Sequence, residues 1–306
     1  MEKNNLSHQI RQLADIAGID ALGFAAAGEF KGYRLTMSRR RSPKLSLPDA
    51  KTVIVAGIYI GGLTLPAWSN PHWGRASRLY LSGFFLDVVK PLAPVADLLK
   101  SRGYSAVFCD GSEADGSTLP LKLAAIRAGL GWQGKHSLLI SRKFGTFLAL
   151  GGIITNAALD LNETEEKNRC AECDQCQVAC PLGAIDRPHV LDTSKCLSNL
   201  LQEDHLPEAA KEIMENRVGD CEICQEACPW NKKHLKHPLD TGLTRAFKGK
   251  TKEWESFFHL PELVKLTEKG YRDSLVRLNT GIPYDLFHRN VLIAMTHAKT
   301  ASTRPL

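Results

Sequence analysis

The sequence has no apolar segment long enough to cross a membrane and no recognisable export signal. Its longest apolar stretch, from Phe147 to Leu159, is interrupted by Thr155 and Asn156, whereas a membrane-spanning helix needs about 20 predominantly apolar residues. The N-terminal residues also lack the apolar core and cleavage site of a signal peptide. We therefore expect a cytoplasmic protein that does not contact a membrane.

Cysteine is nearly missing from the first 165 residues. That part of the chain contains only Cys109, which follows an apolar run and is expected to be buried and unreactive. The other eight of the nine cysteines lie between residues 170 and 228. Because thiols in the cytoplasm are kept reduced, such a concentration indicates metal or redox ligands rather than disulfides.

Apolar spacing divides the chain into helical and strand segments. It predicts helices near the N-terminus and over residues 84–101, 119–130 and 289–297. It also predicts buried strands over residues 53–58 and 147–154 and a short strand over residues 106–108. We expect an α+β protein in three parts. These are an α/β-type N-terminal domain (1–165), a bacterial-ferredoxin-like domain (166–232) and a short helical extension that packs on both (233–306).

The eight clustered cysteines form two related motifs. The first is Cys170-x2-Cys173-x2-Cys176-x3-Cys180-Pro181, and the second is Cys196 followed by Cys221-x2-Cys224-x3-Cys228-Pro229. In bacterial ferredoxins, three closely spaced cysteines bind one cluster and the fourth, before proline, binds the other. The motifs therefore predict two [4Fe–4S] clusters: cluster A on Cys170, Cys173, Cys176 and Cys228, and cluster B on Cys180, Cys196, Cys221 and Cys224. Structural zinc is the alternative, although its paired C-x2-C knuckles fit this spacing poorly.

Several segments outside this cassette carry a family resemblance. They are PDAKTVIVAGIYI (48–60), Tyr80 in the context Arg-x2-Arg-Leu-Tyr, AGLGWQGKHSLLIS (128–141) and LDTSKCLS (191–198), with the cassette itself ending in CQEACPWN. Together they resemble the epoxyqueuosine reductase family. The resemblance implies an N-terminal, nitroreductase-like domain that binds cobalamin and receives electrons from the clusters. It also implies reduction of epoxyqueuosine to queuosine in tRNA, the last step of queuosine biosynthesis.

The resemblance places the catalytic proton donor at Asp115. Asp110 and Glu113 are nearby rivals, and Asp115 as a simple helix-start residue is the alternative. Ser117 or Thr118 is expected to cap the helix that follows.

A second set of positions suits a large flat cofactor. Glycines let backbone approach such a ligand, an aromatic ring can stack on it, and polar side chains can contact its amide or phosphate groups. The alternative is a glycine-rich helix exit packed in the core. The positions are Gly129, Gly131, Trp132, Gly134, Lys135 and His136.

Two positions depart from the family and leave other functions open. Leu121 and Lys122 stand where the family typically has glutamate and arginine, and lysine keeps the charge but loses the planar fork of arginine. Many members also carry HEAT-type repeats after the clusters, where this chain is expected to hold one helical hairpin. The second hypothesis is therefore a corrinoid-dependent reductase of another small molecule such as an organohalide. The third is a non-catalytic double-cluster electron-transfer protein.

Basic segments and a net charge of +6 permit a nucleic-acid partner. Lysines and arginines recur over residues 31–44 and 232–252, which suits the phosphate backbone of tRNA equally well as a plain solvated surface. A flavodoxin or a ferredoxin is the expected electron donor.

Overall fold

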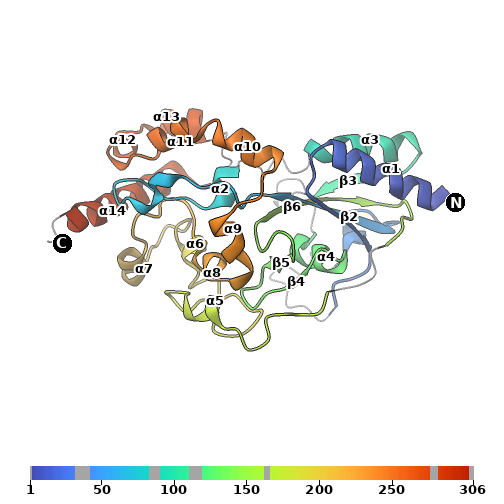
Figure 1. Cartoon of the computed structure of the whole chain (residues 1–306), viewed down its shortest axis with the longest axis horizontal. Helices are drawn as coiled ribbons and strands as arrows, with labels where there is room; N and C mark the ends of the chain where they lie inside the picture. The colour runs from blue at the N-terminus through green and yellow to red at the C-terminus, as the bar shows by residue number, and fades with distance from the viewer. Residues whose placement is uncertain are drawn as a thin grey trace. The chain divides into compact units, whose positions relative to one another are not determined.

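A computed structural model describes residues 2–31, 42–82, 90–109, 119–161, 166–275 and 282–302 (Figure 1). The chain divides into two compact units. Unit 1 consists of Met1–Tyr59, Phe84–Gly134 and Leu138–Ala171, and unit 2 of Ile60–Gly83, Lys135–Ser137 and Glu172–Leu306. Within the described ranges, every helix is too short or too polar to cross a lipid bilayer. The division into three domains remains a prediction.

Unit 1 is built on a four-stranded sheet with the strand order β1-β2-β6-β3. The strands are β1 (Ala21–Ala26), β2 (Thr52–Tyr59), β3 (Ala106–Cys109) and β6 (Leu148–Thr155), and each pairs with its neighbours in antiparallel fashion. The predicted strands over 53–58, 106–108 and 147–154 are confirmed. The expected α/β type is wrong, because that class rests on parallel strands. All eight residues of β2 are buried, so it has the continuous apolar sequence that is typical of a parallel strand.

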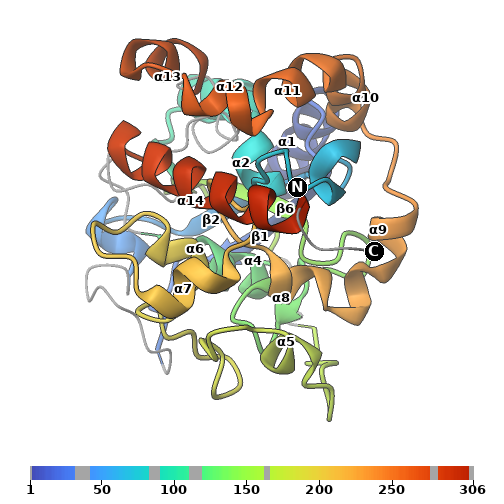
Figure 2. The same ribbon diagram turned by 90° about the vertical axis from the view of Figure 1, so that its left-hand side faces the viewer.

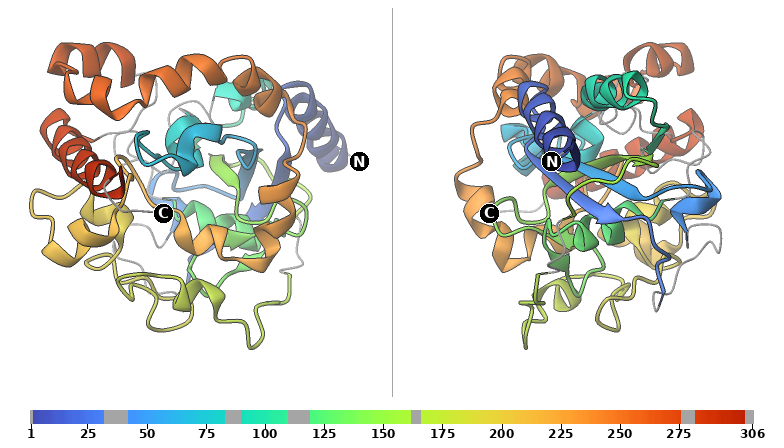
Figure 3. Two further views of the ribbon diagram at one scale, coloured as in Figure 1. Left: turned by 60° about the vertical axis from the view of Figure 1, so that its left-hand side comes forward. Right: turned by 90° about the vertical axis from the view of Figure 1, so that its right-hand side faces the viewer.

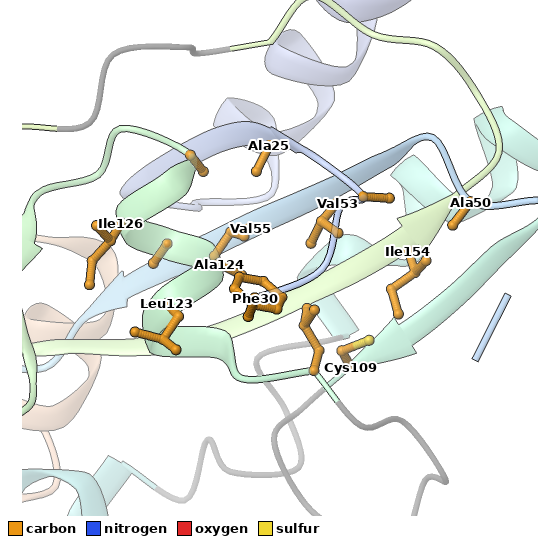
Figure 4. Packing of buried hydrophobic residues seen from close by; sticks show 14 of the residues in the cluster. Ala25, Phe30, Ala50, Val53, Val55, Cys109, Leu123, Ala124, Ile126 and Ile154 are labelled. Atoms are coloured by element: carbon orange, nitrogen blue, oxygen red, sulfur yellow. The ribbon is translucent and has the colours of Figure 1, made fainter. Parts of the chain in front are cut away.

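Helices cover both faces of this sheet. α1 (Glu2–Ile16) and α3 (Ala93–Ser101) pack on one face, against Ile54 and Ile153. α4 (Leu121–Arg127) packs on the other, against Val53, Val55 and Ile154 (Figure 4). Alternate residues of a strand point to opposite faces, so β2 supplies both cores. Each large side chain buried there contributes roughly 1.5–3 kcal/mol relative to an exposed one.

The predicted helices of unit 1 are shorter in the structure. α3 begins at Ala93 after a 3-10 turn at Lys90–Leu92, and residues 84–89 are outside the described ranges. α4 covers only residues 121–127 of the predicted 119–130. Its N-cap is Pro120, with no side-chain hydrogen bond. Ser117 and Thr118, the predicted caps, lie outside the described residues.

Glycines turn the chain sharply after α4. Gly129 has φ +74° and Gly131 has φ +154°, and the chain then pairs as β4 (Trp132–Gln133) with β5 (Leu139–Ile140). A Cβ atom on Gly131 would lie 2.0 Å from the carbonyl oxygen of Ile140. The close approach at Gly131 is therefore made by the protein's own backbone.

Unit 2 is mainly helical, and most of its helices are short. The segments that precede residue 232 form α2 (Arg78–Ser82), α5 (Gln175–Val178), α6 (Leu197–Leu200), α7 (Glu208–Ile213) and α8 (Ile223–Glu226). Six more follow: α9 (Lys232–Lys236), α10 (Gly242–Lys248), α11 (Thr251–Phe257), α12 (Leu260–Val264), α13 (Glu268–Leu275) and α14 (Tyr284–Ser302) (Figure 3). The expectation of a short tail with one hairpin is therefore wrong, although the predicted helix over 289–297 is confirmed within α14.

The last helix, α14, forms hydrogen bonds with the segment between Cys196 and Cys221. The side chain of Asn290 is fully buried and donates hydrogen bonds to the carbonyl oxygens of Leu201 (2.9 Å) and Val218 (3.2 Å). Arg289 donates to the carbonyl oxygens of Glu203 (2.6 Å) and Asp204 (2.9 Å). These bonds satisfy backbone groups that no strand or helix partner satisfies, and they fix the insert in the second motif.

Replacing Gly131 with alanine tests the close approach after α4. We expect Gly131→Ala to destabilise the chain by about 3 kcal/mol, because the new methyl group would overlap the Ile140 carbonyl oxygen. The matched control is Gly103→Ala, which also has a positive φ (+80°) but nothing within 4 Å, and should cost about 1 kcal/mol. Urea unfolding followed by far-UV circular dichroism measures both. Equal losses in the two variants would contradict the steric explanation.

Candidate metal centre

The two cysteine motifs have the same local structure. Each places two cysteines around the start of a four-residue helix, α5 or α8, and ends in Cys-Pro. Proline cannot continue a helix, and Pro229 instead begins a 3-10 turn. α5 and α8 lie against each other within unit 2 (Figure 2), so the two motifs face each other as a pair.

The four thiols predicted for cluster B lie together in unit 2. Burial raises the pKa of Cys224, and the thiols of Cys221, Cys196, Cys180 and Cys176 stand close enough to raise it further; Cys176 is a predicted ligand of cluster A. Burial also raises the pKa of Cys221 to about 12. Gathered thiolates are costly in this environment unless a cation neutralises them, and a bound metal deprotonates its thiol ligands. The four residues therefore fit an iron cluster, although their role as ligands remains a prediction.

Backbone N–H groups are directed at these sulfurs. The N–H of Ala184 donates to Sγ of Cys180 at 3.2 Å. Burial raises the pKa of Cys196, and the N–H groups of Asn199 and Ser198 oppose that rise. Hydrogen bonds to sulfur stabilise the thiolate and tune cluster potentials.

The predicted ligands of cluster A fall in both units. Cys170 belongs to unit 1, where its N–H donates to the side chain of Asn168 at 2.8 Å. Cys173, Cys176 and Cys228 belong to unit 2, and the last two are buried. A single zinc ion would need four sulfurs about 2.3 Å from one centre. In the ranges that the structure describes, no three His, Cys, Asp or Glu side chains form a group that could hold one metal ion.

A buried ion network adjoins the second motif. The guanidinium of Arg78 forms an ion pair with Glu222, whose other oxygen accepts the Arg78 N–H at 3.1 Å. Nη2 of Arg75 lies 2.5 Å from Oε1 of Glu226. Burial raises the pKa of Glu222 to about 7, against the lowering effect of the Arg78 charge. Removing one partner of such a pair costs roughly 3–5 kcal/mol, so the network ties α2 to α8. The spacing of these four residues in the sequence does not predict that they form ion pairs.

The predicted cofactor positions are mostly inside the protein. Gly131, Trp132, Gly134 and His136 are buried, which leaves Gly129 and Lys135 as the partly exposed members of the set. Trp132 pairs with Ile140 through the β4–β5 bridge. Their role in binding a cofactor remains a prediction.

The predicted proton donor precedes α4 in the sequence, and the two departures from the family are the first two residues of α4. Asp115, Asp110 and Glu113 are outside the described residues. Leu121 is partly buried against the core beneath α4, and Lys122 is exposed. Leu121 therefore has a packing role that a glutamate could not take.

Comparison with known proteins matches both the cassette and a longer part of the chain. A model of a 4Fe-4S double cluster binding domain matches residues 169–231. The epoxyqueuosine reductase of Gloeobacter violaceus is 35% identical over 198 residues, which are 63% of this chain and 60% of the relative. That of Escherichia coli is 32% identical over 148 residues, 47% of this chain and 38% of the relative. The chain thus spans less than two thirds of the length of these relatives.

Solved structures share the fold. A crystal structure of epoxyqueuosine reductase with an epoxyqueuosine-modified tRNA-Tyr stem loop matches with a TM-score of 0.81 and 23% identity, over 97% of this chain and 83% of that one. A reductive dehalogenase described in terms of B12-dependent dehalogenation matches with a TM-score of 0.54 and 18% identity, over 90% of this chain and 38% of that one. The fold of this chain is that of epoxyqueuosine reductases, and its predicted resemblance to their family is confirmed.

Proposed function

We propose that the chain is a cytoplasmic reductase with two [4Fe–4S] clusters and cobalamin, and that it reduces epoxyqueuosine to queuosine in tRNA. The observation that carries the redox part is the gathering of Cys180, Cys196, Cys221 and Cys224 inside a region that matches a double-cluster domain. Sequence similarity to epoxyqueuosine reductases that extends well beyond this region supports the substrate.

The reaction needs two electrons and two protons. Opening the epoxide to an alkene breaks both carbon–oxygen bonds and releases the oxygen as water. Clusters bound to the two cysteine sets would pass electrons singly from a flavodoxin or ferredoxin. We propose that Asp115 donates a proton to the departing oxygen, as its position before the AGLGW segment implies.

Cobalamin, when bound, supplies a metal centre that can deliver electrons to an organic substrate. The proposal that this chain binds cobalamin rests on the family resemblance and on the fold shared with a dehalogenase described in terms of B12-dependent dehalogenation.

Exposed lysines of unit 2 suit the phosphate backbone of tRNA. Lys248, Lys250 and Lys252 are exposed at the junction of α10 and α11. In the described structure none of the three forms an ion pair with an acidic side chain, in contrast to Lys211 and Lys265, which bind Glu208 and Glu262 at 3.0 Å. Free positive charge of this kind binds polyanions by releasing their counterions.

Iron content tests the cluster ligands. Anaerobic reconstitution should load about eight iron atoms per chain, four per cluster. We expect Cys224→Ser to lower this to about four, because cluster B loses a ligand. Cys109→Ala is the control and should keep all of the iron, since Cys109 is buried in the core of unit 1. Bound zinc without visible cluster absorbance would support the structural zinc site instead.

Turnover tests the reaction and the proton donor. Reconstituted protein with cobalamin and a low-potential reductant should convert epoxyqueuosine in tRNA to queuosine, measured by mass spectrometry of nucleosides. Asp115→Asn should lower kcat at least about 100-fold, the usual contribution of a general acid, while Asp110→Asn should stay near the unmodified rate.

Equal activity of the Asp115→Asn and Asp110→Asn variants would remove Asp115 from the mechanism.

A second substrate class follows from Leu121 and Lys122 and from the dehalogenase fold match. Release of halide from an organohalide, with no conversion of tRNA, would favour that corrinoid-dependent reductase.

Salt dependence tests the lysine surface. The triple change Lys248→Ala, Lys250→Ala and Lys252→Ala should weaken tRNA binding and reduce the slope of log K against log salt by about 2, given roughly 0.7–0.9 per phosphate contact. The matched control removes three ion-paired lysines, Lys195, Lys211 and Lys265. Filter binding over a range of salt concentrations measures both. If both triple variants lose the same tRNA affinity, binding depends only on the net charge of the chain and not on the position of the three lysines.

A further inference from the structure

The short helix α9 presents three lysines directly after the second cysteine motif. It begins four residues after Cys228, a predicted ligand of cluster A. Lys232, Lys233 and Lys236 are exposed, whereas His234 is buried and lies on the inner side of the helix. The outer side of α9 is therefore a compact patch of positive charge.

No neighbouring acid neutralises this patch. The nearest acidic residues before and after α9 in the sequence are Glu226 and Asp240. Glu226 is paired with Arg75 at 2.5 Å, and Asp240 with Arg245 at 3.1 Å. In the part of the chain that the structure describes, none of the three lysines of α9 forms an ion pair. Their charge is available to a partner of opposite sign.

Hydrogen bonds connect α9 to the segment that carries the predicted ligands. α9 contacts the 3-10 turn at Pro229–Asn231. The N–H of Asn231 donates to the carbonyl oxygen of Cys228 at 2.9 Å, and the fully buried side chain of Asn231 donates to the carbonyl oxygen of Gln225 in α8 at 2.6 Å. Figure 2 shows α9 apart from α10 and α11. A partner bound on α9 would thus lie next to the cassette and away from the lysines at the α10–α11 junction.

The composition of this surface favours a protein over a nucleic acid. Leu235 lies among the three lysines and is 37% exposed. Protein interfaces combine an apolar centre with a charged or polar rim, whereas an exposed leucine adds nothing to the binding of a phosphate backbone. Electron-transfer partners also form the smallest of the specific protein interfaces, which suits a helix of five residues.

We propose that the outer side of α9, made of Lys232, Lys233, Leu235 and Lys236, is the docking surface of the electron donor, a small redox protein with an acidic face. The proposal rests on the proposed function, because it takes Cys228 as a cluster ligand. One electron leaves the reduced donor and one enters cluster A, so the donor is oxidised and the cluster is reduced, and no bond forms or breaks. Opposite charges accelerate the encounter of such partners.

Cross-linking tests the contact without depending on turnover. A water-soluble carbodiimide joins a lysine amine to a carboxylate that touches it. The reconstituted full chain is mixed with an acidic flavodoxin, treated with the carbodiimide and digested for mass spectrometry. We expect cross-links from Lys232, Lys233 or Lys236 to acidic residues of the flavodoxin. Cross-links confined to lysines outside α9 would overturn the proposal.

The rate of cluster reduction tests the role of the charge. In the triple variant Lys232→Ala, Lys233→Ala and Lys236→Ala, reduction by the same flavodoxin should slow at least about tenfold at low salt, and its dependence on salt should weaken. Reduction by dithionite, a small reductant that needs no docking surface, should be unchanged at full iron content. Stopped-flow measurement of the visible absorbance follows both reactions.

A second triple variant controls for net charge. Lys51→Ala, Lys100→Ala and Lys269→Ala remove the same charge at exposed positions that form no ion pair in the described structure, and should keep the rate of reduction by flavodoxin. An equal loss in both triple variants would overturn the proposal. Weaker tRNA binding by the α9 variant with an unchanged rate of reduction would overturn it too, because α9 would then serve the nucleic acid.

The same preparation keeps this inference distinct from the proposed function. If the unmodified chain holds about eight iron atoms but converts no tRNA, the substrate is wrong and the cross-linking and reduction experiments still decide the proposal. If neither an acidic flavodoxin nor an acidic ferredoxin reduces its clusters, the docking proposal alone is overturned. If the unmodified chain holds no cluster, the premise shared by both has failed, and the proposal fails with it.

Discussion

Unit 2 is organised around the cost of bringing several thiols together away from water. Burial alone raises the pKa of Cys196, Cys221 and Cys224, so the protein without iron disfavours the thiolates that iron requires. Backbone N–H groups and the charge of a bound cluster act in the opposite direction. The surrounding side chains therefore have to hold the sulfurs in place before the metal can compensate them. Two carboxylates that flank Cys221, Asp220 and Glu222, do so by binding α2.

Local motifs were predictable from the sequence because their geometry is local. The spacing of the cysteines predicts which of them can reach one cluster, and that assignment remains a prediction; in the structure Cys176, Cys180, Cys196 and Cys221 all lie near enough to Cys224 to raise its pKa. The strand over residues 53–58 was equally plain, because it is a short apolar run rich in β-branched residues. Leu6 and Ile10 gave the N-terminal helix by their helical spacing, and both are buried.

Features that depend on distant partners were not predictable in the same way. β2 is covered on both faces, so its sequence does not reveal that its neighbours run antiparallel. The helices α9 to α13 have five to eight residues each, too few for a periodic apolar pattern to stand out. The pairing of Arg78 with Glu222 joins residues 144 apart in the sequence. A buried asparagine such as Asn290 looks like any polar helix residue until the carbonyl groups that it serves are known.

The bonds between α14 and the insert impose an order on biosynthesis. Asn290 emerges from the ribosome 89 residues after Leu201, the carbonyl group that it holds. During that interval every predicted cluster ligand has already been synthesised, while the segment between Cys196 and Cys221 still lacks its clamp. The segment therefore lacks these hydrogen bonds while α9 to α13 are being synthesised. The final conformation of a segment in the middle of the chain therefore depends on a helix at its C-terminal end.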